Sequence, residues 1–176
     1  MFAAIASHSG DCYFEYCYGT EFPKAVSGLQ SVGGLRPFLE QLRTRAWPKF
    51  PGHLFDTLNI VAMTHFYSPN PEAEHGIDLP FDEVTGERRE DVFARWRERD
   101  PVELVARHAA AMRDLRLLWI ECGTRDEYNL YHGARILSSR LEDLGVEHVF
   151  EEFDDDHRSL NYRYDETLPR LAAALQ

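Results

Sequence analysis

The sequence has no long apolar run, and nowhere does it approach the roughly 20 consecutive apolar residues that a membrane-spanning helix needs. Its N-terminal segment, MFAAIASHSGD, is apolar but carries no basic region, so it does not match a signal peptide. Cysteine is also scarce: Cys12, Cys17 and Cys122 are the three in the chain, and their spacing does not suit a metal site. We interpret them as reduced thiols and expect a cytoplasmic protein.

Basic residues are outnumbered in this chain. Lysine and arginine together number 19 against 30 aspartates and glutamates, which gives a formal net charge of −11. An acidic surface repels phosphate groups, so we expect neither nucleic acid nor an anionic membrane as a partner. The composition is otherwise that of an ordinary globular protein, and 176 residues are enough for one domain with a core. We therefore predict a single domain over residues 1–176.

Several motifs that would identify a cofactor are missing. The sequence contains no G-x-G-x-x-G and no P-loop, which argues against nucleotide binding. Its eight histidines show no H-E-x-x-H or similar grouping, so we expect no metal site. We predict that the protein uses no cofactor.

The first two thirds of the chain alternate between apolar segments and turn signals. The apolar run at 2–7 predicts a buried strand that ends in a turn. Helical spacing predicts helices over 23–46, with a break at Gly33 and Gly34, and over about 54–66. The stretch 68–87 is rich in proline and predicts a long loop. Asp100 and Pro101 predict the N-cap and first turn of a further helix.

The last third of the chain predicts an alternation of strand and helix. The segment 115–122 is mostly apolar, as in a strand buried on both faces. A helix over about 130–144, ended by Gly145, leads to a second strand at 146–153, and 167–169 (Thr-Leu-Pro) predicts the start of a last helix. A strand–helix–strand unit of this kind pairs its strands in parallel. We therefore predict an α/β fold with about three strands in a mostly parallel sheet, flanked by helices.

An acid and a histidine follow the two strands of this unit. Asp126 comes after Gly-Thr-Arg at the end of the first strand, and His157 follows three aspartates after the second. Ligands of open α/β sheets bind beyond the carboxyl ends of the strands, where both residues would meet. There an aspartate orients a histidine ring that accepts and returns a proton, as in a hydrolytic triad. Glu127 is the alternative acid; we prefer Asp126 because its shorter side chain is more easily fixed.

A plainer interpretation exists for each member of the pair. Asp126 also fits an exposed acid at a helix N-terminus, where the helix dipole favours negative charge. His157 also fits a surface histidine in a charged loop. The placement of both residues at neighbouring strand ends is what favours the catalytic hypothesis.

The nucleophile of such a triad is missing from the sequence. No G-x-S-x-G pentapeptide occurs, although a serine held in a sharp strand-to-helix turn needs small neighbours. The nearest approach is 7–11 (Ser-His-Ser-Gly-Asp), in which Ser7 and Asp11 replace the flanking glycines. Ser9 is therefore a weak candidate for the nucleophile. We interpret His8 and Ser9 as strand-end residues that line a substrate pocket.

Three segments of the chain resemble a known family. They are FAAIASHSGDCYFEYCY at 2–18, the stretch 100–137 around CGTRDE, and the stretch 148–175 around EEFDDDH. These segments are similar to the C-terminal portion of the esterase D-like and enterochelin-esterase-like group of α/β-hydrolases. The resemblance implies a serine carboxylesterase that acts on a small-molecule ester, with Asp126 as the acid and His157 as the base.

The same resemblance implies that part of the machinery lies outside the chain. In this family the nucleophile elbow lies upstream of the strand that 2–7 resembles, so we expect a truncated α/β-hydrolase without its N-terminal strands. We expect the chain to be inactive by itself. The alternative is a non-catalytic remnant, or a small-ligand-binding module that keeps the esterase pocket. The apolar strand at 2–7 would then form an exposed sheet edge, which predicts self-association.

Overall fold

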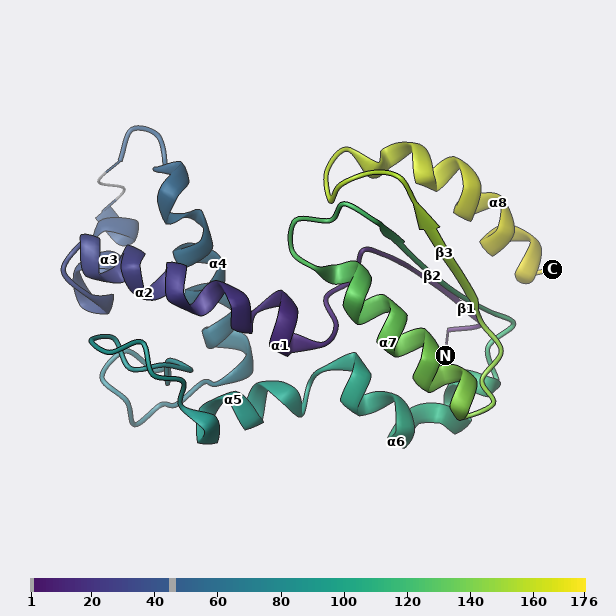
Figure 1. The fold of residues 1–176 in the computed structure, drawn as a ribbon, viewed down its shortest axis with the longest axis horizontal. Helices are drawn as coiled ribbons and strands as arrows, with labels where there is room; N and C mark the ends of the chain where they lie inside the picture. Colours follow the sequence, from purple (N-terminus) through teal and green to yellow (C-terminus); the bar gives the residue numbers. More distant parts are fainter. Residues whose placement is uncertain (1, 45–46) are drawn as a thin grey trace. The chain divides into compact units, whose positions relative to one another are not determined.

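The computed structural model describes residues 2–44 and 47–176, and its contacts divide the chain into two compact units (Figure 1). The sheet unit consists of Met1–Cys17 and Asp100–Gln176, and the helical unit consists of Tyr18–Arg99. Each unit has its own buried apolar residues and is described by itself. The single domain predicted over 1–176 stays a prediction.

The sheet unit is built on three parallel strands in the order β1-β2-β3. They are β1 (Ala4–His8), β2 (Leu117–Gly123) and β3 (Val149–Phe153). The unit also holds α1 (Phe14–Cys17), α6 (Pro101–Arg113), α7 (Leu130–Asp143), the short 3-10 helix η3 (Leu160–Arg163) and α8 (Tyr164–Ala174). This arrangement confirms the predicted α/β fold with a three-stranded parallel sheet flanked by helices.

The central strand β2 is covered on both faces, as its apolar sequence predicts. Leu118 and Ile120 point to the side of α6 and α7, where both line a cavity with residues of these helices. Trp119 and Glu121 point to the side of η3 and α8, because Arg170 lies over the Trp119 ring and Arg163 binds Glu121. Successive side chains of a strand alternate between faces, so one short segment can serve two helical layers.

Asp100 caps α6 as predicted, and it does more than the sequence indicated. Its side chain accepts a hydrogen bond from the Val102 amide at 2.9 Å. It also accepts from the amides of Tyr13, at 3.0 Å, and Phe14, at 2.6 Å, at the start of α1. Burial raises the pKa of Asp100 against the lowering effect of these three donors. One carboxylate therefore ties together two segments of the sheet unit that are distant in sequence.

The helical unit contains α2 (Phe22–Ser31), α3 (Leu35–Thr44), α4 (Phe55–Tyr67) and α5 (Glu90–Arg97), with short 3-10 helices η1 (Gly19–Glu21) and η2 (Gly52–Leu54). The predicted break at Gly33 and Gly34 is confirmed, and both glycines have left-handed φ angles of 93° and 104°. The predicted helix over 23–46 ends in the structure at Thr44, and residues 45–46 lie outside the described residues. The core is aromatic: the Phe22 ring lies within 6 Å of three others, at 5.4 to 5.8 Å.

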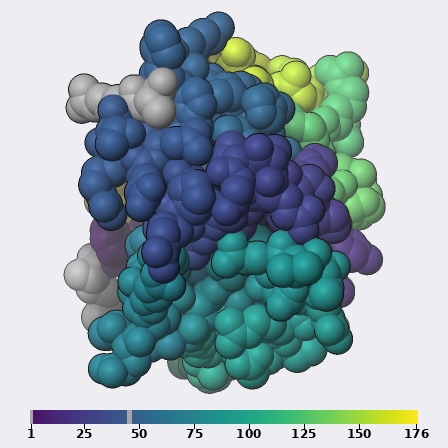
Figure 2. All heavy atoms as spheres, turned by 90° about the vertical axis from the view of Figure 1, so that its left-hand side faces the viewer, coloured from purple at the N-terminus to yellow at the C-terminus, as the bar shows by residue number. Residues whose placement is uncertain are grey.

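The long loop predicted at 68–87 packs back onto the helices of its own unit. Gln30 of α2 donates to the carbonyls of Glu83 and Val84 at 2.8 and 3.0 Å, and the Leu35 amide of α3 donates to the Glu83 carboxylate at 2.8 Å. Figure 2 shows this face, with the purple and dark blue spheres of α2 and α3 directly against the teal spheres of the later segment. The loop is therefore an ordered part of the helical unit.

The largest differences between predicted and observed boundaries are at the last helix and the last strand. The last helix begins at Tyr164, directly after η3, so 167–169 do not start it and Pro169 lies inside α8. The prediction was wrong because the turn of η3 already begins the helix. The hydrogen bond that the proline removes lies on an exposed part of it. Strand β3 begins at Val149 instead of 146. No described helix is long and apolar enough to cross a bilayer.

Candidate functional site

The structure brings Asp126 and His157 together at the carboxyl ends of β2 and β3. Asp126 Oδ2 lies 2.9 Å from His157 Nδ1. The Asp126 side chain is fully buried, whereas the His157 side chain is 36% exposed. A carboxylate on Nδ1 fixes the tautomer of the ring and leaves Nε2 to exchange protons with a bound molecule. This geometry is that of an acid–base pair whose ring solvent or a ligand can reach.

The Asp126 carboxylate is held by the chain that follows it. Its Oδ1 atom accepts a hydrogen bond from the Tyr128 amide at 2.9 Å, and the Leu130 amide at the start of α7 lies at 3.5 Å. The Cys122 thiol lies 3.9 Å from Oδ2, within reach of a weak hydrogen bond. Donors on both oxygens keep the carboxylate aimed at His157 without help from a ligand.

Glu127, the alternative acid, binds the same loop by a different route. Its Oε2 atom accepts a hydrogen bond from the His157 backbone amide at 3.1 Å, and its Oε1 atom accepts from Arg158 Nε at 3.0 Å. Desolvation works to raise the pKa of Glu127, but hydrogen bonds from its own amide, His157 and Arg158 hold that pKa below its ordinary value. The two neighbouring acids therefore hold different parts of His157. Asp126 binds the imidazole ring, and Glu127 binds the backbone amide.

Gly123 lets the loop after β3 come close to the end of β2. A Cβ atom at Gly123 would lie 2.4 Å from the Asp155 carbonyl oxygen and 2.9 Å from that of Asp156. Beside it, the Arg125 amide donates to the Asp155 carbonyl at 3.0 Å. Gly123 does not have a left-handed φ angle, so the glycine is required here for the space it leaves and not for its backbone freedom.

Tyr128 completes the surroundings of the histidine. Its ring packs edge-on against the His157 ring, with centroids 5.0 Å apart and planes at 84°. Such a contact limits the rotation of the imidazole and covers part of it. Nothing in the sequence pattern marks Tyr128 except its position two residues after Asp126.

His8 and Ser9 do not join this pair. His8 Nδ1 lies 2.8 Å from Glu121 Oε1 within the sheet, and its Nε2 lies 3.3 Å from the Thr167 hydroxyl. Ser9 is 5% exposed, and its buried Oγ has no hydrogen-bond partner among the described residues. No hydrogen bond therefore connects the Ser9 hydroxyl with the ring of His157. A hydroxyl so deeply buried is also poorly accessible to a substrate.

A separate cavity of about 170 Å³ lies in the sheet unit, on the side of α6 and α7. His8, Ser9, Asp126 and His157 are not among the residues that line it. Most of its lining is apolar, so it suits a small hydrophobic group. The lining residues are Ser7, Gly10, Asp11, Cys12, Pro101, Met112, Leu118, Ile120, Glu121, Ala134, Leu137 and Leu141.

In the part of the chain that the structure describes, potential metal ligands form no cluster and the cysteine thiols are buried. Among residues 2–44 and 47–176, no group of three or more histidine, cysteine, aspartate or glutamate side chains is arranged to hold a metal ion. Cys12, Cys17 and Cys122 are free and buried, and burial raises the pKa of Cys122 to about 12. A thiol with so high a pKa is a poor nucleophile near neutral pH. The groups that the structure brings together for proton transfer are Asp126 and His157.

Comparison with known proteins adds no identification. No family model matches the chain, and no curated protein sequence matches it.

Proposed function

We propose that this chain carries the acid and the base of a serine carboxylesterase of the α/β-hydrolase type. The observation that supports the proposal most is the 2.9 Å contact between a buried Asp126 carboxylate and Nδ1 of a half-exposed His157 at adjacent parallel strand ends. In this role Asp126 orients the ring and stabilises the imidazolium. His157 takes the proton from a serine as general base and returns it to the leaving alcohol as general acid. The substrate is a small-molecule ester.

The serine of the triad comes, in this proposal, from a segment outside these 176 residues. The burial of Ser9, which is 5% exposed, supports this view, because a nucleophile must reach both the base and the substrate. We therefore expect the chain by itself to have little or no esterase activity.

Hydrolysis of p-nitrophenyl acetate tests this expectation. The chain and its His157→Ala variant are expected to give the same rate, close to that of buffer. Hydrolysis at an ordinary enzymatic rate that the H157A substitution abolishes would contradict the proposed inactivity and point to Ser9. Labelling with a fluorophosphonate, followed by peptide mapping, locates any reactive serine directly.

The acid–base hypothesis itself needs a nucleophile to be supplied. If the coding DNA upstream of Met1 contains an in-frame G-x-S-x-G, the longer chain is expected to hydrolyse the ester. Its activity is expected to fall by a factor of about 10³ or more in H157A. A longer chain that is active and unaffected by H157A would overturn the role of His157.

The apolar cavity favours a second candidate function, a small-ligand-binding module without catalysis. Its volume of about 170 Å³ suits a short acyl or alkyl group, and its walls lie away from the Asp126–His157 pair. Binding of short-chain fatty acids or alcohols by calorimetry, with no fluorophosphonate label on any serine, is the result expected for this alternative. Met112→Trp would fill the cavity and is expected to abolish such binding.

We also propose that the chain self-associates through β1. This strand lies at the edge of the sheet, where Ile5 is 40% exposed and Phe2 is 82% exposed. An apolar edge with unpaired backbone groups favours pairing with another chain. Analytical ultracentrifugation is expected to show mass rising with concentration, and Ile5→Lys is expected to reduce it. A monodisperse monomer with a sharp unfolding transition would contradict this proposal.

We also propose that the protein is located in the reducing cytoplasm, which its three free cysteines support.

A further inference from the structure

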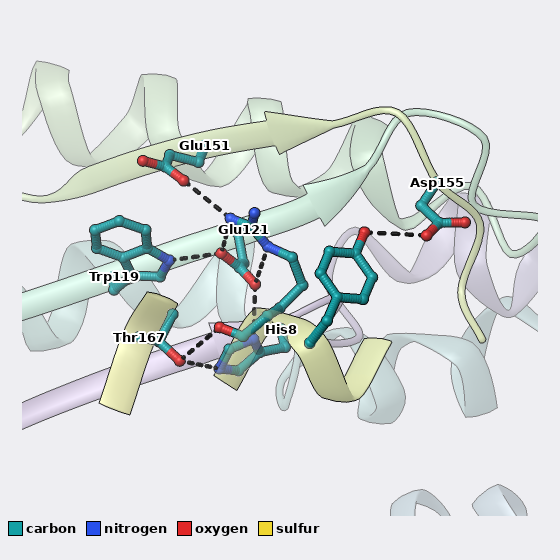
Figure 3. Close-up of polar contacts among 8 residues, drawn as sticks. His8, Trp119, Glu121, Glu151, Asp155 and Thr167 are labelled. Carbon is teal, nitrogen blue, oxygen red and sulfur yellow. Dashed lines mark hydrogen bonds and ion pairs between the residues drawn. The ribbon is translucent and has the colours of Figure 1, made fainter. Parts of the chain in front are cut away.

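A row of three polar side chains crosses the sheet on the side of η3 and α8. Glu121 of β2 is in register with His8 of β1 on one side and with Glu151 of β3 on the other. Figure 3 shows the Glu121 carboxylate at the centre of a connected set of hydrogen bonds that reaches all three strands. Glu121 is 1% exposed and interrupts an otherwise apolar strand. A buried carboxylate at such a position is costly unless each oxygen is satisfied.

Arg163 supplies the charge that Glu121 requires. Its Nε atom donates to Glu121 Oε1 at 3.1 Å and its Nη2 atom donates to Oε2 at 2.7 Å, a two-point contact. Trp119 Nε1 and His8 Nδ1 occupy the other positions at 2.9 and 2.8 Å. Both oxygens therefore have two partners each, which is close to the full capacity of a carboxylate. The buried Glu121 carboxylate is therefore satisfied, beside an Arg163 side chain that is 12% exposed.

The same guanidinium also holds β3. Arg163 Nη2 lies 3.0 Å from Glu151 Oε2, and the guanidinium stacks over the Phe153 ring at 4.6 Å. Phe153 is the last residue of β3, and Arg163 is the last residue of η3. The chain that leaves the sheet at Phe153 is therefore brought back onto the sheet by Arg163. His157 lies within this excursion.

The first half of the excursion has its own attachments. The Thr124 amide donates to the Phe153 carbonyl at 2.9 Å, and the Arg125 amide donates to the Asp155 carbonyl at 3.0 Å. In the second half, after Arg158, the Tyr162 hydroxyl donates to Asp155 at 3.0 Å, and the Tyr162 ring lies edge-on to Phe153 with centroids 6.4 Å apart. The Arg163 side chain adds ion pairs to Glu121 and Glu151 of the sheet. The loop is therefore fixed at both ends, with the histidine between them.

We propose that Arg163 is a positioning residue for His157: by binding Glu121 and Glu151 it fixes the end of the 154–163 loop and so keeps the imidazole on the Asp126 carboxylate. The proposal rests on the proposed function for its catalytic meaning. Its structural content is a coupling between a buried ion pair and the Asp126–His157 contact. The Asp126–His157 hydrogen bond does not by itself keep the ring in place. Asp126 can hold the imidazole only while the 154–163 loop keeps it within hydrogen-bond distance.

Two NMR measurements report on His157 without any catalytic reaction. The first is hydrogen exchange of the His157 amide, which donates a hydrogen bond to Glu127. The second is the downfield resonance of the His157 Nδ1 proton, which is hydrogen-bonded to Asp126. It is assigned by its loss in His157→Gln. Arg163→Met is expected to speed amide exchange about tenfold, equivalent to about 1.4 kcal/mol of local stability, and to broaden or remove the Nδ1 resonance.

The matched control removes a similar ion pair from the same strand. Arg135 binds Glu152 of β3 through Nε at 2.8 Å and Nη2 at 3.2 Å. Among the described residues, no hydrogen bond or ion pair joins Arg135 to the 154–163 loop. Arg135→Met is expected to leave both His157 signals unchanged. Unchanged signals in R163M, or equal changes in R163M and R135M, would overturn the proposal.

A double variant separates positioning from folding. Arg163→Met alone leaves a buried, partly unpaired Glu121, which can unfold the chain, whereas an apolar pair of similar volume is often tolerated. Glu121→Met combined with Arg163→Met is therefore expected to keep the circular dichroism of the wild type while showing the His157 changes of R163M. A folded double variant with wild-type His157 signals would refute the proposal. These results are independent of esterase assays. If R163M disturbs His157 but the longer chain is active and unaffected by H157A, the proposed function alone is overturned.

Discussion

Replacing Gly123 with alanine tests the close approach on which the candidate site is built. The new Cβ atom would lie 2.4 Å from the Asp155 carbonyl oxygen and 2.9 Å from that of Asp156. Both atoms belong to the backbone, so no side chain can rotate away to relieve the contact. The loop must therefore move, together with the Asp155 carbonyl that accepts a hydrogen bond from the Arg125 amide. We therefore expect both a loss of stability and a displacement of His157.

The magnitude follows from two opposing terms. Overpacking at a closely packed position costs about 1–3 kcal/mol. Alanine recovers about 0.4–1 kcal/mol by restricting the unfolded chain, because the glycine does not need a left-handed φ. The balance is a loss of about 1–2 kcal/mol, which for a chain of this size lowers Tm by about 2–8 °C.

Thermal unfolding by circular dichroism measures the first effect, and the Nδ1 proton resonance of His157 measures the second. Gly52→Ala is the matched control, because a Cβ atom there meets nothing within 4 Å. We expect G52A to unfold at or slightly above the wild-type temperature with an unchanged His157 resonance. If G123A behaves like G52A in both measurements, the steric reasoning about Gly123 is wrong.

Three further predictions concern buried groups. Asp100→Ala leaves three amides without their acceptor, two of them in buried hydrogen bonds, and is expected to lower the free energy of unfolding in urea by about 3 kcal/mol. Asp100→Asn is expected to cost less because it keeps one oxygen, and equal stability of D100A and wild type would contradict the role of this cap. Desolvation works to raise the pKa of Glu121, but Arg163, Trp119 and His8 together hold it below its usual 4.5. Stability from Glu121 is therefore present above about pH 4.5 and lost as pH falls through the lower folded value; acid unfolding curves should show this loss, and Glu121→Gln should remove it. Cys122, whose pKa burial raises to about 12, is expected to react with iodoacetamide at pH 8 only after unfolding, so rapid labelling of the native chain would count against its burial.

Much of the sheet unit could be predicted from local patterns. The apolar run before Cys122, the stripe that begins at Leu130 and the terminating Gly145 predicted β2 and α7 correctly, since burial and periodicity are recorded in short windows. The start of α8 could not be placed, because the loop and η3 that precede it depend on the anchor at Arg163. Helix α5 was missed, although Val92, Phe93 and Trp96 give it an apolar face. The division into two units was hidden because one of them is discontinuous in sequence.

The candidate site shows the same contrast. The pairing of Asp126 with His157 could be predicted, because parallel strands end at a common edge and each residue follows its strand closely. The roles of Glu127, Gly123 and Tyr128 could not, since each depends on a loop about 30 residues away in sequence folding back onto it. His8 was interpreted as a pocket residue from its position alone. Its partner Glu121 lies more than a hundred residues later, and a local pattern cannot reveal such a contact.

The Asp100 cap has a consequence for how this chain can vary. The helical unit is an insertion: the chain leaves the sheet unit after Cys17 and returns at Asp100. Asp100 is the first residue on return, and it binds Tyr13 and Phe14, just before the exit. These hydrogen bonds lie within the sheet unit, so they do not depend on the sequence of the inserted segment. The loop-closure entropy of a longer insertion costs little, about 0.6 kcal/mol for each doubling of its length. We therefore expect exchange of residues 18–99 for a short linker to leave the sheet unit folded, with the helix and strand signals of that unit retained in circular dichroism.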